Sequence, residues 1–135
     1  MAFSDPAKGR QVQWSPGPAA PTVTLAAACK EGDILGYSSG WKPALATVSS
    51  VIQGRLVALK NGATGDTVPV SHTAVVKGYS GATPGNLIYV AEGTSNGQVT
   101  DTAPSTSGDA NTIIGIALAT DTILFFLNSR VDSTA

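Results

Sequence analysis

Charged residues are what this sequence has least of. Asp, Glu, Lys and Arg make up 13% of the chain, about half the usual share in soluble domains. The net charge of -1 provides no field that would attract nucleic acid or an anionic membrane. Because the cores of protein interfaces are depleted in charge, two interpretations stay open: a chain partly covered by partners, or a monomeric domain with a surface of Thr and Ser.

Cysteine and histidine are nearly absent, with Cys29 and His72 as the single examples. One cysteine cannot form an intrachain disulfide, and one histidine cannot build a multi-histidine metal site. We interpret Cys29 as a small buried hydrophobe. We place His72 on the buried face of an expected strand, as a structural residue. The sequence therefore predicts no metal, no cofactor and no enzymatic activity.

The acidic residues give no contrary signal. Asp33, Asp66 and Asp109 each directly follow a glycine, which favours turns in which the short carboxylate bonds to nearby backbone. The glycine-rich turns lack the spacing of phosphate-binding loops. Lys8 and Arg10 are the only close basic pair in the N-terminal region, without interleaved aromatics. We expect no nucleic-acid, membrane or small-molecule partner.

Long apolar runs are also missing, so no segment has the length of a transmembrane helix, and the N-terminus has no signal-peptide pattern. Residues 1–21 instead hold four prolines and two glycines, which exclude a regular element through most of the segment. We interpret them as an extended arm. Gln11 to Trp14 alternates with the period of a strand, so the arm is expected to add a strand to the edge of a neighbouring protein. The alternative is that Trp14 folds back on its own domain.

Residues 22–128 alternate short β-rich runs with turns, which predicts an all-β domain: a compact sandwich or barrel-like arrangement of short antiparallel strands. Residues 55–59 are apolar almost throughout and are expected at the centre of the core. Pro69 cannot donate to a ladder, so its strand is expected at a sheet edge or at a bulge. Residues 112–119 and 123–127 predict two long core strands. Residues 129–135 are expected to form a polar C-terminal tail.

The order of these β-segments resembles the small head-decoration, or capsid-cement, proteins of tailed bacteriophages. The phrases that carry the resemblance are GDILGY at 32–37, ATGDTVPV at 63–70 and IIGIAL at 113–118. The resemblance covers about residues 22–127. It rests on segment order and turn phrases, since no catalytic signature is present.

The resemblance implies a structural protein, made in the host cytoplasm, that sits on the outer surface of the virion capsid. Such proteins commonly form trimers at three-fold or local three-fold positions and clamp neighbouring major capsid proteins. The expected partners are therefore the major capsid protein and two further copies of the chain. The expected capsid-binding arm residues are Phe3, Lys8, Arg10, Val12 and Trp14. The expected subunit-interface residues are Tyr37, Trp41 and Tyr79.

A second hypothesis comes from another functional class. The chain could be a carbohydrate- or receptor-binding β-module of a phage tail or fibre, with Tyr37, Trp41 or Tyr79 stacking on a sugar. A third hypothesis, a hydrolase using Cys29 or His72, has no surrounding signature to support it.

Overall fold

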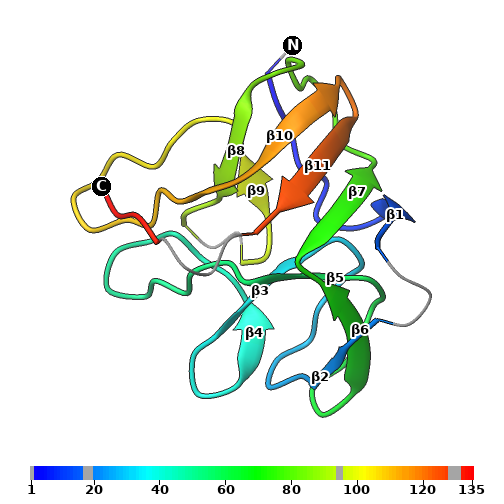
Figure 1. Ribbon diagram of the computed structural model, residues 1–135. Helices are drawn as coiled ribbons and strands as arrows, with labels where there is room; N and C mark the ends of the chain where they lie inside the picture. The colour runs from blue at the N-terminus through cyan, green and yellow to red at the C-terminus, as the bar shows by residue number, and fades with distance from the viewer. Residues whose placement is uncertain (1, 17–19, 94–95, 128–131) are drawn as a thin grey trace.

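The computed structural model describes residues 2–16, 20–93, 96–127 and 132–135. Two antiparallel sheets pack together as a compact β-sandwich, which confirms the predicted all-β fold (Figure 1). Within these ranges, no helix of the protein could cross a membrane.

The larger sheet has six strands in the order β1-β7-β11-β10-β8-β9, and every neighbouring pair is antiparallel. It lies in the upper half of Figure 1. Its strands are β1 (Gln11–Trp14), β7 (Thr73–Lys77), β11 (Thr122–Phe126), β10 (Ile113–Ala119), β8 (Leu87–Val90) and β9 (Val99–Thr100).

The smaller sheet has five strands in the order β2-β6-β5-β3-β4, again all antiparallel. Its strands are β2 (Thr22–Thr24), β6 (Thr67–Ser71), β5 (Leu56–Ala58), β3 (Ile34–Tyr37) and β4 (Trp41–Pro43). Strands β3 and β4 form a hairpin, in which Leu35 lies opposite Pro43 and Tyr37 lies opposite Trp41.

The main core lies between the sheets. Ile34 and Val57 of the smaller sheet share one buried cluster with Ile123 and Phe125 of the larger one, and all four side chains are fully buried. In a strand, alternate residues point to opposite faces. Only every second residue of β11 can therefore enter this core, and the residues between them lie on the outer face of the larger sheet.

The smaller sheet has a second apolar cluster on its other face. Leu35 and Ala58, the chain neighbours of Ile34 and Val57, pack there with Leu25 and Cys29. Residues 25–29 do not continue strand β2; they lie over this face, held by paired backbone hydrogen bonds between Cys29 and Gly62 of 2.9 and 3.0 Å. Strand β5 is therefore apolar on both faces because both are covered, as its sequence predicts.

The N-terminal segment belongs to the domain rather than standing apart from it. Strand β1 pairs with β7 through Gln11 opposite Lys77 and Val12 opposite Val76. Ser4 forms an isolated bridge with Ser80. The strand-adding behaviour expected of the arm occurs, but it occurs at the edge of the protein's own larger sheet.

Two sequence-based expectations for the middle of the chain are wrong. His72 is exposed, because the chain bends there and passes from β6 in one sheet to β7 in the other, which breaks the alternation. Strand β6 is not an edge, since it lies between β2 and β5. The Pro69 carbonyl accepts a hydrogen bond of 3.0 Å from the Leu59 amide, just beyond the end of β5. The N–H that proline lacks would face the same position, because the N–H and C=O of a strand residue point to the same side. The missing donor therefore falls where the ladder ends.

The described residues of the C-terminal tail are docked as well. The Asp132 carboxylate accepts hydrogen bonds of 2.5 and 2.6 Å from the Arg55 guanidinium. Thr134 bridges Ala110, and the Ser133 amide donates to Thr112 at 2.7 Å. The beginning of the expected tail, residues 129–131, lies outside the described residues.

Candidate functional site

The outer face of the larger sheet is the main candidate for function. The pairing register fixes which side chains share it. Phe125 and Ile123 point into the core, so Leu124 and Phe126 point outward, and so do the residues paired directly with them. Leu124 lies opposite Val75 on β7 and opposite Ile116 on β10.

The same register extends to both sides of these three residues. Val75 is paired with Trp14 on β1, and Ile116 is paired with Leu87 on β8. Five strands therefore place one large apolar side chain each in a line across the sheet. We call this line the outer row; in spatial order it consists of Trp14, Val75, Leu124, Ile116 and Leu87.

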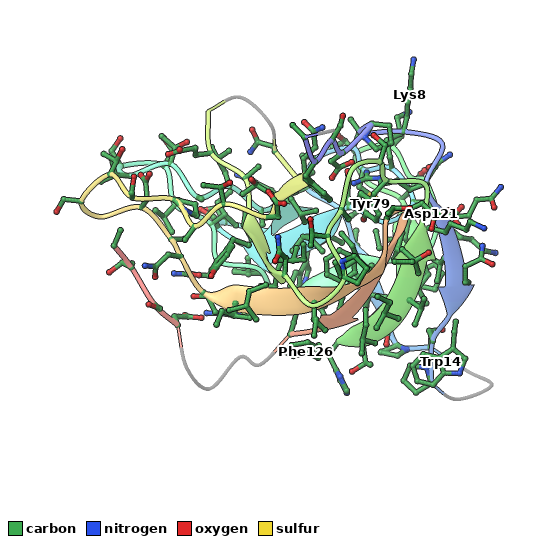
Figure 2. All side chains as sticks on the ribbon, turned by 90° about the horizontal axis from the view of Figure 1, so that it is seen from above. Lys8, Trp14, Tyr79, Asp121 and Phe126 are labelled. Carbon is green, nitrogen blue, oxygen red and sulfur yellow. The ribbon has the colours of Figure 1, made fainter. Side chains whose placement is uncertain are left out.

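The outer row is open to solvent at both ends and half-buried in the middle. Trp14 is 51% exposed and Leu87 is 42% exposed. Exposed apolar residues flank the row: Leu118 (49%), Ile113 (42%) and Phe126 (41%). Figure 2 shows Trp14 and Phe126 on the same side of the molecule, with Lys8 projecting from the opposite side.

Charge is nearly absent from this sheet. Lys77, at the end of β7, is the one charged residue among its six strands. The Lys77 ammonium lies 3.7 Å from the Asp121 carboxylate, and both side chains are about half exposed. Such an exposed pair adds little stability. The face thus combines apolar side chains with an almost complete lack of charge, which is the composition of an interface core.

A buried ionic cluster fixes the N-terminal segment to the domain. Arg10 is 2% exposed, and its guanidinium pairs with Asp5, at 3.2 Å, and with Asp33. Asp5 also accepts a hydrogen bond of 3.0 Å from the Val99 amide, and Asp33 accepts one of 2.9 Å from the Lys30 amide. We call Asp5, Arg10 and Asp33 the arm cluster. It joins the segment before β1, the turn before β3 and the start of β9.

The electrostatics of the arm cluster follow from burial and pairing. Burial raises the pKa of Asp33 above its ordinary value, while the nearby Arg10 charge opposes that rise. Burial lowers the pKa of Arg10, but Asp5 and Asp33 more than compensate, so the net pKa is raised. The guanidinium therefore stays charged and is the counter-ion for two buried carboxylates.

The five expected arm residues have different fates in the structure. Phe3 stacks on Tyr79 with ring centroids 5.9 Å apart, and Val12 packs against the main core. Arg10 is a correction: its partners are acids of its own chain, so it is not available to a neighbouring protein. Lys8 and Trp14 remain exposed. Of the five, only these two present their side chains to solvent.

The three expected interface aromatics do not come together. Tyr79 is 3% exposed and contacts Phe3 and Phe125, so it is a core residue and is corrected from a surface role. Tyr37 is 66% exposed and meets the half-buried Trp41 edge-on, with centroids 5.5 Å apart. Tyr37 and Trp41 lie on the smaller sheet, away from the outer row.

Cys29 and His72, the two residues considered for catalysis, lie in different environments. Cys29 is buried, and burial raises the pKa of its thiol to about 11. The exposed His72 ring bonds to the Thr73 hydroxyl at 2.8 Å. In the part of the chain that the structure describes, no group of three or more His, Cys, Asp and Glu side chains is placed to hold a metal ion.

Sequence reasoning missed both the outer row and the partners of Arg10. The row had a signal: β10 and β11 are apolar at almost every position, as in strands covered on both faces. The residues of the outer row come from five strands, so the row can be recognised only once the pairing of these strands is known. For Asp33, the expected local turn bond to Lys30 is present, and the pairing with Arg10 across the chain is the part that local sequence cannot show.

The fold and this face together define a small β-sandwich with an uncharged, apolar sheet surface and a docked N-terminal strand. No family model matches the chain, and neither a curated protein nor a solved structure is significantly similar to it.

Proposed function

We propose that this chain is a capsid decoration protein of a tailed bacteriophage. In this role it binds the outer surface of the head and stabilises contacts between major capsid proteins, as a homotrimer. The observation that carries the proposal is the outer row, because the largest exposed apolar patch of a protein is often the surface through which it binds another protein. The resemblance of residues 22–127 to head-decoration proteins is the reason for proposing a phage capsid as the assembly to which the chain binds.

The physical logic of such a clamp is avidity. A single small contact on a capsid would be weak, but three linked copies bind with a high effective concentration once one of them has docked. A docked N-terminal segment favours this arrangement. Its ordering entropy, about 1–2 kcal/mol per residue of backbone, is already offset within the fold by β1 pairing and the arm cluster, and so need not be supplied at the capsid.

The test is co-sedimentation with expanded, undecorated capsids of the virus that encodes the protein. We expect saturable binding at a fixed ratio to the major capsid protein. Lys8→Glu is the arm variant to compare, because Lys8 is exposed and on the side opposite Trp14 and Phe126. If the arm contacts the shell through Lys8, this variant binds more weakly with unchanged unfolding stability. Absence of saturable binding by the wild-type protein would overturn the proposal.

A second candidate function rests on the Tyr37–Trp41 pair. An exposed aromatic ring held edge-on by a second ring is a geometry that can stack on a sugar. For a carbohydrate-binding module of a phage tail or fibre, we expect glycan-array binding that Tyr37→Ala abolishes and Phe126→Ala leaves intact. Capsid binding without any glycan signal would reject this second function.

A further inference from the structure

The outer face of the larger sheet is as apolar as a sheet face that is covered by another part of a protein. Strand β5 is also apolar on both faces, and its second face is covered by residues 25–29 of the same chain. Strands β10 and β11 have the same composition, and within the described residues their outward side chains, such as Leu118 and Phe126, stay 49% and 41% exposed. The chain thus leaves this face open to something other than its described segments.

The size of the face suits a protein interface. Its five most exposed large side chains, Trp14, Leu87, Ile113, Leu118 and Phe126, are each 41–51% exposed. They offer an apolar area on the order of 500 Å², if a fully exposed large side chain offers about 200 Å². That is near the upper end of roughly 300–600 Å² for the largest patch on a monomer. It is more than half of the roughly 800 Å² that one partner contributes to a standard interface.

The lack of charge on the outer face favours a second copy of this chain as its binding partner. An uncharged surface gives no preference for an acidic or a basic partner, and burying a charged partner surface against it would leave that charge unpaired. A second copy brings the same uncharged row. Its only charged group on these strands, Lys77, already has Asp121 beside it, so two copies can approach without like-charge repulsion.

From these observations we infer that copies of this chain associate through the outer row and its flanking residues, with the outer face of the larger sheet as the contact between subunits. The inference rests on the proposed function only in that it names the surface joining the copies of the proposed trimer. It assigns this role to the larger sheet, and not to the Tyr37–Trp41 pair or to the buried Tyr79.

The experiment is the solution mass of the full chain, measured by light scattering and sedimentation equilibrium up to about 1 mM. We expect the wild type to have a mass that is a multiple of the monomer. The double variant Leu118→Lys, Phe126→Lys places two charges on the face, and we expect its dissociation constant to rise at least about 100-fold, the effect of losing two interface side chains. The matched control is Tyr37→Lys, which places a charge at a still more exposed aromatic position (66%) on the other sheet and is expected to leave the mass unchanged.

Two results would overturn the inference: a wild type that is monomeric over the whole range, or a double variant that associates as the wild type does. If the double variant fails to fold by circular dichroism, Leu118→Gln replaces it, since Leu118 is 49% exposed and belongs to neither core cluster. Capsid sedimentation separates this inference from the proposed function. A monomeric wild type that binds capsids, and whose Phe126→Lys variant does not, would assign the face to the shell and reject association between copies.

Discussion

Replacing Arg10 with alanine is expected to lower the free energy of unfolding by about 3–5 kcal/mol, the usual cost of removing one member of a buried ion pair. The guanidinium is the counter-ion of Asp5 and Asp33, and both carboxylates are nearly inaccessible to solvent. Without it, two negative charges face each other in the interior. The loss also frees the segment before β1, because Arg10 additionally donates to the Ala7 carbonyl at 3.0 Å.

The stability loss in the Arg10→Ala variant is expected to depend on pH. Burial raises the pKa of Asp33 in the folded state above its ordinary, unfolded value. The folded state is therefore favoured by Asp33 protonation below the ordinary Asp pKa, and this contribution is lost as pH rises through the raised pKa. Removing Arg10 lets this pKa rise further. We therefore expect the variant's deficit to be smaller at about pH 5 than at about pH 7.

Urea unfolding of the Arg10→Ala variant at both pH values checks this prediction, with Lys8→Ala as the matched control. Lys8 is a cation of the same segment but is exposed, so its replacement is expected to change stability by less than about 0.5 kcal/mol. Equal stability of the two variants would show that the arm cluster does not hold the segment in place.

Phe125→Ala is the second substitution with a large expected effect. Phe125 is fully buried between the sheets and touches Tyr79 edge-on, with ring centroids 6.4 Å apart. Truncation removes apolar burial and leaves a cavity in a core formed by both sheets, which costs about 3–5 kcal/mol. We expect a correspondingly lower midpoint of denaturant unfolding.

The chain supplies an unusually close control in the next residue. Phe126 has the same side chain on the same strand but is 41% exposed on the outer face. Phe126→Ala is expected to keep the unfolding free energy of the dilute protein within about 1 kcal/mol, while weakening association between copies. A large loss of stability in this variant, or a small one in Phe125→Ala, would contradict the assignment of the two faces.

The sequence contained most of the strand positions, because they depend on local patterns. The hairpin of β3 and β4, the long pair β10 and β11 and the central strand β5 all follow from β-branched or apolar runs bounded by glycine turns. His72 shows the limit. Its alternation with Val70 and Ala74 continues through a point where the chain changes sheets, and parity cannot reveal a bend.

The candidate surface was less predictable than the fold. Trp14 and Leu87 are 73 positions apart, and only the pairing of β1, β7, β11, β10 and β8 places them in one row. The N-terminal strand illustrates a similar limit. Its alternating pattern predicts that it adds to a sheet edge, but not to which edge; in the structure it pairs with its own sheet, and Arg10 of the same segment meets Asp33 from a distant part of the chain. Long-range charge pairing leaves no periodic signal in a sequence.

Capsid decoration is tested most directly by electron-microscopy density maps of expanded capsids with and without the added protein. We expect difference density on the outer surface at three-fold positions, with three copies of the β-sandwich whose larger sheets face one another through the outer row. No added density would contradict capsid decoration. Copies bound with Trp14 and Phe126 facing solvent would contradict the assigned interface while leaving the decoration role in place.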